Sequence, residues 1–379
     1  MTFSHEYMTT ITNVAESALA TAFGEKVRFG KITTLDSSPR SEVYRIELLA
    51  RPTHNPNSII VKRVLERDGL VNEWAGVQFL TQVADNIPVA PTFYTGDSAT
   101  NIVIMSDLGK GRGLDSYLLG HDPIAAAEAL LKWATALGKM HALTVGKQQE
   151  YEQICNALES RQSASSVSPY LELSILFQHM IAAVDVVPVP GTTDDLTKLT
   201  KTMMQPGPFF AYTHGDPCPD NVILVDGHFK FLDFESGMFR HAMTDAIFAR
   251  LNFPWCWCSA HLPEHLPLMM EQVYRAELVK GCPEANDDTF FFHALVDGCA
   301  AWVAHWDKWL PLTELLQADV PGDYVTSRQK TLFRFSTFVH MTREYGHLES
   351  MGETIRQVLV KLQERWSPEL EVMPYYPTF

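Results

Sequence analysis

Three polar residues, Asp216, Asn221 and Asp233, stand close together in the chain and offer oxygen atoms of the kind that bind divalent cations. What they can do depends on the segments between them. Asn221 and Asp233 flank two short apolar runs, residues 222–225 and 228–232. If these runs pair as a β-hairpin, both side chains lie at its open end, and cation-assisted chemistry is the first hypothesis.

The hairpin is predicted from its turn. Asp226 and Gly227 form one of the dipeptides most favoured in a two-residue type I′ turn. Pairing from this turn puts Asn221 opposite Leu232, and Asp233 follows one residue later. Facing and diagonal side chains then lie roughly 5–8 Å apart. An amide oxygen and a carboxylate at that separation suit Mg²⁺, which keeps further sites for water and phosphates.

Asp216 precedes Asn221 in a loop that Pro217 and Pro219 stiffen. The loop directs the Asp216 carboxylate at the position that the metal would take. An Asp followed at this spacing by Asn, and by a second Asp beyond a hairpin, is the pattern of the catalytic and metal-binding loops of protein-kinase-like enzymes. The residues alone therefore favour phosphoryl transfer.

The flanking residues extend this pattern: His214 and Gly215 come before Asp216, and Phe234 and Glu235 follow Asp233. With them, the segment resembles the aminoglycoside phosphotransferase and choline kinase superfamily of small-molecule kinases. His-Gly-Asp alone also occurs in ordinary loops, and the joint match is what makes the resemblance specific.

The resemblance implies a bilobal, protein-kinase-like α+β fold. We expect a nucleotide-binding lobe with a small antiparallel sheet in residues 1–105, and a larger, mostly helical catalytic and substrate-binding lobe in residues 106–379. A chain of 379 residues, 46% of them hydrophobic, has the length and the apolar material for two lobes.

Lys62 ends a strand-like run and is expected to bind the nucleotide phosphates. A helix expected over residues 71–83 carries Glu73, which sits where the resemblance places the ion-pair partner of that lysine. Glu66 is the competing partner. The alternative is that Lys62 is a solvent-exposed edge lysine, as most lysines are exposed.

Other nucleotide contacts are expected from two connections in the first lobe. Residues 36–41 occupy the position of the phosphate-covering loop but contain no glycine, so the backbone or the hydroxyls of Ser38 and Ser41 would have to reach phosphate. Ser106 and Leu108 belong to the expected hinge, whose backbone would hydrogen-bond the adenine edge.

The helical remainder is where acceptor choice is expected. Asp245 would brace the catalytic loop from behind. Trp302 and Trp306 are four residues apart, hence on one helix face, with Asp297 and Asp307 nearby, an arrangement that suits a cationic amine. Tryptophans at helical spacing are, however, core residues in most proteins.

Composition bounds the remaining possibilities. The formal charge of −15 disfavours a nucleic-acid partner and is compatible with a cationic small substrate. No leader-like start and no apolar run of membrane-spanning length are present, so we expect no membrane partner. Cys256 and Cys258 have no second pair at zinc-site spacing, and we expect a reduced, cytoplasmic compartment as the default.

Together these features predict an ATP- and Mg²⁺-dependent kinase that phosphorylates a hydroxyl of a small, amino-bearing molecule. Asp216 would orient that hydroxyl and take its proton. Glu235 stands where protein kinases have glycine, which argues against a protein acceptor. The alternative from another class is a pseudokinase that binds nucleotide or acts as a scaffold, which the glycine-free loop favours. The oligomeric state does not follow from the sequence.

Overall fold

The computed structural model describes residues 5–50, 57–86, 88–159, 169–366 and 370–379. The chain forms two compact units, each assembled from three segments. The first unit comprises residues 1–111, 147–164 and 223–238, and the second comprises residues 112–146, 165–222 and 239–379. A small antiparallel sheet and many helices confirm the predicted α+β class. The contiguous division into residues 1–105 and 106–379 stays a prediction.

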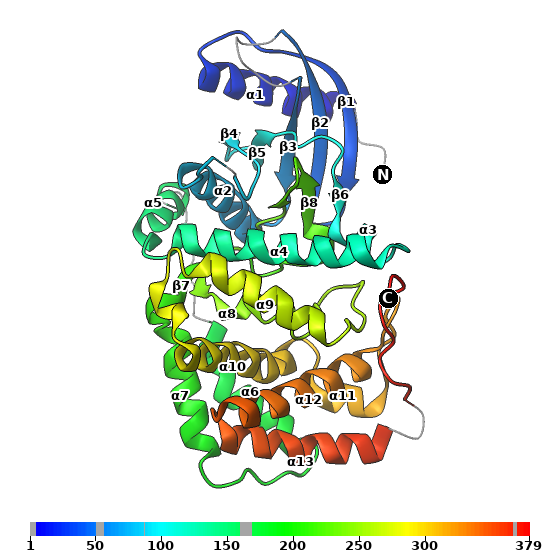
Figure 1. Cartoon of the computed structure of the whole chain (residues 1–379). Helices are drawn as coiled ribbons and strands as arrows, with labels where there is room; N and C mark the ends of the chain where they lie inside the picture. Colours follow the sequence, from blue (N-terminus) through cyan, green and yellow to red (C-terminus); the bar gives the residue numbers. More distant parts are fainter. Residues whose placement is uncertain (1–4, 51–56, 87, 160–168, 367–369) are drawn as a thin grey trace. The chain divides into compact units, whose positions relative to one another are not determined.

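The first unit is built on a five-stranded antiparallel sheet with the strand order β1-β2-β3-β5-β4 (Figure 1). Helix α1 contributes Ile11, Ala15 and Leu19 to the hydrophobic core that the sheet shares with it. This spacing is that of one helix face. The elements are α1 (His5–Phe23), β1 (Arg28–Ser37), β2 (Ser41–Ala50), β3 (Ser58–Val64), β4 (Phe93–Asp97) and β5 (Ile102–Ser106).

Helix α2 (Arg67–Gln82) connects β3 to β4 and packs against α5 (Gln148–Glu159). The predicted hairpin is present as β8 (Val222–Val225) and β9 (His228–Phe231). Its turn residues have the positive φ angles of a type I′ turn, 50° at Asp226 and 81° at Gly227. The hairpin prediction is therefore confirmed, although β9 ends one residue earlier than expected.

The second unit is mostly helical. In Figure 1 its long helices lie in successive layers, and α4 packs on α9, α10 on α12, and α12 on α13. The strands β7 and β10 pair with each other. The elements are β6 (Arg112–Gly113), α3 (Leu114–Leu118), α4 (Pro123–Thr144), α6 (Leu173–Ala182), α7 (Thr192–Met204), β7 (Phe210–Thr213), β10 (Met238–His241), α8 (Met243–Ala246), α9 (His265–Leu278), α10 (Asp288–His305), α11 (Leu312–Gln317), α12 (Ser327–Tyr345) and α13 (Glu349–Trp366).

Helix α4 shows how local sequence signals fix an element. It begins at Pro123, where proline costs no hydrogen bond, and the Asp122 carboxylate accepts from the backbone N–H groups of Ile124 and Ala125. Gly138 lets α9 approach closely, because a Cβ at this position would lie 2.5 Å from the carbonyl oxygen of Tyr274. Helix α4 thereby gives the second unit a rigid element.

Candidate active site

Lys62 is the buried cation of the first unit. Its Nζ lies 2.9 Å from Glu73 Oε2 and 2.6 Å from Asp233 Oδ1. Strand β3 supplies the lysine and α2 supplies the glutamate, and the two residues are only 6% and 1% exposed. The ion pair of Lys62 with Glu73 is confirmed.

The charge of Lys62 is maintained by its partners. Burial lowers the pKa of the Lys62 ammonium, but the carboxylates of Glu73 and Asp233 outweigh that effect and hold the pKa above its ordinary value. The lysine therefore stays protonated across the physiological pH range. A buried cation held in one geometry is ready to meet an anion without being reordered.

The segment after β9 is fixed to α2. Asp233 has a left-handed backbone, with φ 64°, and the next N–H, that of Phe234, donates to Glu73 Oε2 at 2.7 Å. The side-chain amide of Asn72 donates to the carbonyl of Glu235 at 2.9 Å. The same glutamate of α2 thus orients both the lysine and the backbone beside Asp233. The Asp233 carboxylate is 37% exposed and accessible to a ligand.

A cavity of ≈ 220 Å³ in the first unit ends at this charged cluster. Its walls are mainly apolar, and its lining includes the hinge residues and the polar cluster. Of the residues predicted to contact nucleotide, Lys62, Glu73, Ser41, Ser106 and Leu108 line it, and Ser38 does not. The apolar lining includes Leu35, Val43, Ile60, Met105, Ile223 and Leu232. Such a slot with one charged end suits a flat base joined to an anionic group.

The connection between β1 and β2 is a tight turn. The Ser38 hydroxyl accepts from the backbone N–H groups of Arg40 and Ser41, at 3.2 and 3.1 Å, and donates to the Ser41 carbonyl. Ser38 therefore stabilises the turn itself. Arg40 Nη1 lies 2.5 Å from Glu235 Oε1, an ion pair that the sequence did not predict.

The hinge contains a second unpredicted ion pair. Arg45 donates two hydrogen bonds to the Asp107 carboxylate, at 2.7 and 3.0 Å, and the Ser58 hydroxyl donates a third at 2.6 Å. Burial alone would raise the pKa of Asp107, but these donors lower it. The Gly109 N–H also donates to this carboxylate. The hinge backbone beside Leu108 is thereby held in one conformation.

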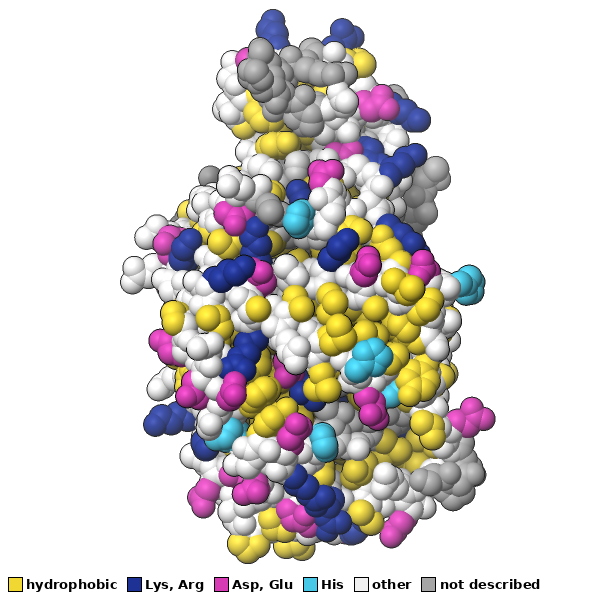
Figure 2. All heavy atoms as spheres, in the orientation of Figure 1, with side chains coloured by type: hydrophobic (Ala, Val, Ile, Leu, Met, Phe, Trp, Pro, Cys, Tyr) yellow, Lys and Arg dark blue, Asp and Glu magenta, His cyan; other side chains and the backbone are white. Residues whose placement is uncertain are grey.

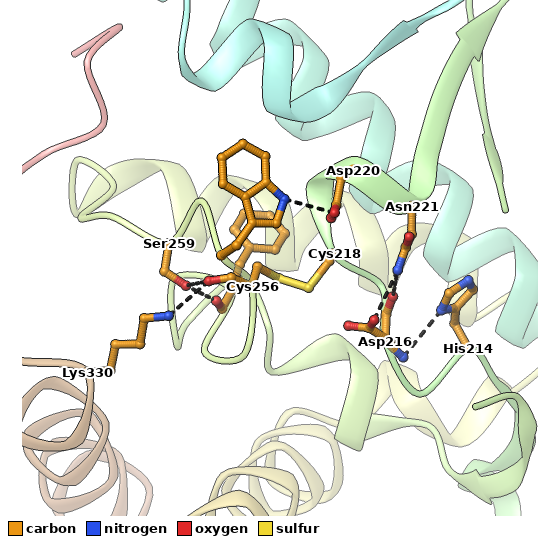
Figure 3. Close-up of a disulfide and its surroundings, with 10 residues drawn as sticks. His214, Asp216, Cys218, Asp220, Asn221, Cys256, Ser259 and Lys330 are labelled. Carbon is orange, nitrogen blue, oxygen red and sulfur yellow. Dashed lines mark hydrogen bonds between the residues drawn. A yellow bond between two sulfur atoms is a disulfide. The ribbon is translucent and has the colours of Figure 1, made fainter. Parts of the chain in front are cut away.

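In the second unit, Asp216 and Asn221 form a compact loop (Figure 3). The Asn221 amide nitrogen donates to the Asp216 carbonyl and to its Oδ2, each at 3.0 Å. The backbone N–H groups of His214 and Gly215 donate to the Asp245 carboxylate, at 2.6 and 3.2 Å. Asp245 is 1% exposed. These two hydrogen bonds confirm the expected brace behind the loop that carries Asp216.

Helix α4 supplies the next layer of support. His141 is fully buried, and its Nδ1 lies 2.8 Å from the hydroxyl of Tyr274. Its Nε2 lies 3.6 Å from Asp245 Oδ2. Burial would raise the pKa of Asp245, but interaction with His141 lowers it. The brace therefore stays ionised, as acceptance of two backbone N–H groups requires.

The two predicted magnesium ligands fit the ion by their chemistry. The amide nitrogen of Asn221 is used by Asp216, which leaves the amide oxygen as the atom it can offer. Asp233 offers a partly exposed carboxylate. Both are oxygen donors, as Mg²⁺ requires. Because Asn221 and Asp233 belong to different units, their separation stays a prediction.

A disulfide joins Cys218, two residues after Asp216, to Cys256. The other four cysteines, Cys155, Cys258, Cys282 and Cys299, are free. This bond was not predicted from the sequence. Asp216 lies near both sulfurs, but bonded sulfurs offer no thiolate to a metal.

The tryptophans expected to bind a cation are differently disposed. Trp302 donates to the carbonyl of Thr244 and packs against Phe248, and Asp297 is buried with His347. The Trp306 side chain lies outside the described part of the chain. Exposed aromatic rings occur instead at Trp255, Trp257 and Trp309, and Figure 2 shows hydrophobic side chains gathered on the visible face of the second unit. Trp302 is therefore engaged in contacts within the second unit, and the prediction for the Trp306 ring lies outside the described residues.

Among the described residues, no helix is both long and apolar enough to cross a membrane. No protein-family model matches the chain, and no curated protein matches it in sequence.

Several solved structures are similar in fold. A choline kinase from Cryptosporidium parvum is 11% identical, with 94% of this chain and 99% of that chain covered, at a TM-score of 0.46. A choline/ethanolamine kinase family protein from Mesorhizobium loti is 12% identical, with 92% and 99% covered, at 0.44. A macrolide 2′-phosphotransferase from Brachybacterium faecium is 15% identical, with 81% and 96% covered, at 0.43. Neither an activity nor a substrate follows from likenesses of this degree.

The resemblance rests on the residues themselves. His214, Gly215, Asp216 and Asn221 lie on a braced loop, and Asp233 pairs with the lysine of a five-stranded antiparallel sheet. The chain is similar, in its motif and in the fold that carries it, to the aminoglycoside phosphotransferase and choline kinase superfamily.

Proposed function

We propose that this protein is an ATP-dependent phosphotransferase that moves the γ-phosphoryl group to a hydroxyl of a small molecule. The observation that carries the proposal is the Lys62 cluster at the end of the apolar cavity. A permanently charged ammonium, fixed by a buried carboxylate, is suited to a nucleotide phosphate. The adjoining apolar slot suits a base.

The nucleotide would bind in the first unit, with its base between the apolar walls and its edge against the backbone of Ser106 and Leu108. Lys62 would bind the phosphates, and Ser41 lines the same cavity. Glu73 acts through Lys62 and is a positioning residue. Asn221 and Asp233 would hold Mg²⁺, which when bound supplies neutralisation of phosphate charge.

Asp216 would orient the acceptor hydroxyl and take its proton, a contribution of about 10²–10⁴-fold. Its backbone is fixed by Asn221, and the loop before it is braced by Asp245. Most of the remaining acceleration would come from alignment of the acceptor with the phosphate. The proposal requires Asp216 and Lys62 to act on the same phosphoryl group.

The acceptor we propose is a small molecule that carries an amine. The formal charge of −15 attracts cations, and exposed rings at Trp255, Trp257 and Trp309 offer faces to an ammonium group. Asp220, which accepts a hydrogen bond from the Trp257 indole, adds a carboxylate to these rings. We propose the cytoplasm as the compartment, because that is where ATP is consumed.

A nucleotide-binding pseudokinase is the second candidate. The observation that favours it is the turn between β1 and β2, which lacks glycine and uses the Ser38 hydroxyl for its own hydrogen bonds. Such a protein would bind Mg-ATP without transferring phosphate.

The test measures ADP release over a panel of amines, amino alcohols and aminosugars, each with a hydroxyl group. We expect turnover on some acceptors, lost at least 100-fold in Asp216→Asn. Asp194→Asn, a matched change on the exposed face of α7, should keep full activity. Full activity of Asp216→Asn would remove that residue from the reaction. Thermal stabilisation by Mg-ATP with no turnover would favour the pseudokinase, and absence of nucleotide binding would contradict both candidates.

A further inference from the structure

We infer that the Cys218–Cys256 disulfide is a positioning cross-link of the loop that carries Asp216, and that its reduction slows phosphoryl transfer without weakening nucleotide binding. The inference rests on the proposed function for its kinetic part. Its structural part, the dependence of the loop on the cross-link, stands on the contacts of the second unit alone.

Cys218 lies between the two polar residues of the loop and bonds to both through its backbone. Its N–H donates to the Asp216 carbonyl at 2.8 Å, and its carbonyl accepts from the Asn221 N–H at 3.0 Å. The same Asp216 carbonyl also accepts from the Asn221 side chain. Displacement of Cys218 therefore disturbs the two backbone hydrogen bonds through which it joins Asp216 to Asn221.

The partner cysteine is held firmly. The Cys256 carbonyl accepts from the Ser259 N–H at 3.2 Å, from the Ser259 hydroxyl at 2.8 Å and from Lys330 Nζ at 2.9 Å (Figure 3). Lys330 belongs to α12, so the segment around Cys256 is anchored to a long helix. Burial lowers the pKa of Lys330 to about 8. The disulfide thus ties a catalytic loop to a fixed point.

A second described link between these segments is weak. The Trp257 indole donates to Asp220 Oδ2 at 2.9 Å, and Trp257 is 44% exposed. A single exposed hydrogen bond contributes little to stability, because water competes for both groups. After reduction this exposed contact would not replace the covalent link between the loop and the anchored segment.

In the proposed cytoplasmic compartment the disulfide could be reduced and re-formed. Disulfides in reducing compartments are usually transient, catalytic or redox-sensing. A dithiol reductant would attack one sulfur as its thiolate, form a mixed disulfide and release the other cysteine, and its second thiol would then close a cyclic disulfide. Two electrons and two protons pass to the protein, which gains two thiols, and the dithiol is oxidised.

The neighbouring thiol does not take part in this exchange. Cys258 is fully buried, and burial, with the charge of Asp220, raises the pKa of its thiol to about 12. It therefore stays protonated and is a poor nucleophile. Cys218 and Cys256 are themselves only 3% and 2% exposed, so reduction requires local opening of the loop and should be slow.

The first measurement is a thiol count on the denatured full chain, made without and with prior reduction by dithiothreitol. We expect four thiols before reduction and six after it, with a cross-linked peptide that contains Cys218 and Cys256. Six thiols in protein purified under oxidising conditions would overturn the inference.

The second measurement follows turnover and nucleotide affinity together. Reduction of the native chain, and separately Cys218→Ser, should lower kcat by about 10–100-fold with the KM for ATP unchanged within twofold, because misplacement of a reacting group affects the transferring step. Re-oxidation should restore kcat of the reduced native chain. Cys155→Ser, a change of a free cysteine, should behave as the native protein. Equal kcat of the oxidised and reduced chains would contradict the inference.

Hydrogen exchange separates this inference from the proposed function. On reduction, amides of residues 214–221 should exchange at least tenfold faster, whereas those of β3, which carries Lys62, should not change. If the oxidised chain turns over none of the acceptors, the proposed function fails, and exchange still decides the role of the disulfide. Unchanged exchange in residues 214–221 would overturn the inference that the disulfide positions this loop. A uniform increase in exchange over both units would also overturn that inference.

Discussion

The two polar clusters of this protein are held in place by different physical means. In the first unit, Lys62, Glu73 and Asp233 fix one another through charge. In the second unit, Asp216 is held by hydrogen bonds within its loop, and that loop is fixed by the backbone bonds to Asp245 and by a disulfide. The first arrangement depends on a complete set of charges, and the second depends on the path of the backbone.

This difference suits the roles proposed for the two clusters. A cation that binds phosphates must keep its charge and direction, and paired carboxylates provide both. A carboxylate that takes a proton must not be neutralised in advance by a close cation, so its position has to come from neutral or remote groups. Substitutions that remove a charge should therefore have their largest effect on the cluster of the first unit. Changes that free the backbone of the loop should have their largest effect on the cluster of the second unit.

Lys62→Met is the largest expected effect. The substitution removes the Lys62 ammonium from the buried Glu73 carboxylate, which keeps the hydrogen bond from the Phe234 N–H. Breaking a buried ion pair in this way typically lowers the free energy of unfolding by about 3–5 kcal/mol. Phosphoryl transfer should fall by about 10²–10³-fold. Chemical denaturation and ADP release measure the two effects.

The control for this prediction separates charge from packing. In Lys62→Met combined with Glu73→Leu, stability should return towards that of the native protein, because no buried charge is left unpaired, whereas activity should stay low. Lys26→Met, at an exposed lysine of the same unit, should change neither quantity. Full activity of the double variant would remove the ammonium from the reaction.

Cys218→Ser is expected next in size. The disulfide closes a loop with a sequence separation of 38, and loss of such a cross-link typically lowers the unfolding free energy by about 2–4 kcal/mol, mainly through the entropy of the unfolded chain. Urea denaturation of the oxidised native protein, the reduced native protein and Cys218→Ser measures it. The last two should agree, and identical midpoints for all three would refute the prediction.

Asp245→Asn should lower the free energy of unfolding by about 1.5–3 kcal/mol, because a charged carboxylate accepts stronger hydrogen bonds from the N–H groups of His214 and Gly215 than a neutral amide does. The pKa of Asp245 is lowered in the folded protein, so its contribution is present above its ordinary pKa of 3.8 and is lost as pH falls through the folded value. The stability difference between the native protein and Asp245→Asn should thus be constant near neutral pH and shrink below about pH 4. A difference that grows on acidification would exclude an ionised brace.

Local patterns predicted the parts of the structure that local interactions decide. The hairpin followed from Asp226 and Gly227, a turn pair that acts on its immediate neighbours. The pair of Lys62 with Glu73 required the resemblance, because nothing in the spacing of the two residues distinguishes Glu73 from Glu66. Helix α7 was not predicted, although Leu196, Leu199 and Met203 have helical spacing and Asp194 stands in its first turn.

Several contacts between distant segments were not predicted. The disulfide joins cysteines with a separation of 38, and neither neighbouring sequence distinguishes Cys256 from Cys258 as the partner of Cys218. The ion pair of Arg40 with Glu235 has a separation of 195 and depends on the path of the fold. Trp302 lies in a helix, as predicted. Its indole donates to the carbonyl of Thr244 in α8, and helical spacing alone does not reveal this contact.

Arg40→Ala has the smallest expected effect. It tests whether an exposed ion pair of the first unit contributes as much to stability as the buried pair of Lys62 with Glu73. Arg40 contacts Glu235, but its side chain is 60% exposed, and exposed ion pairs typically contribute about 0–1 kcal/mol. The unfolding free energy should change by less than about 1 kcal/mol, and less again at high salt because screening weakens the native pair. A loss as large as that of Lys62→Met would show that both pairs act as one cluster, whereas a small loss with an altered KM for ATP would assign Arg40 to the nucleotide.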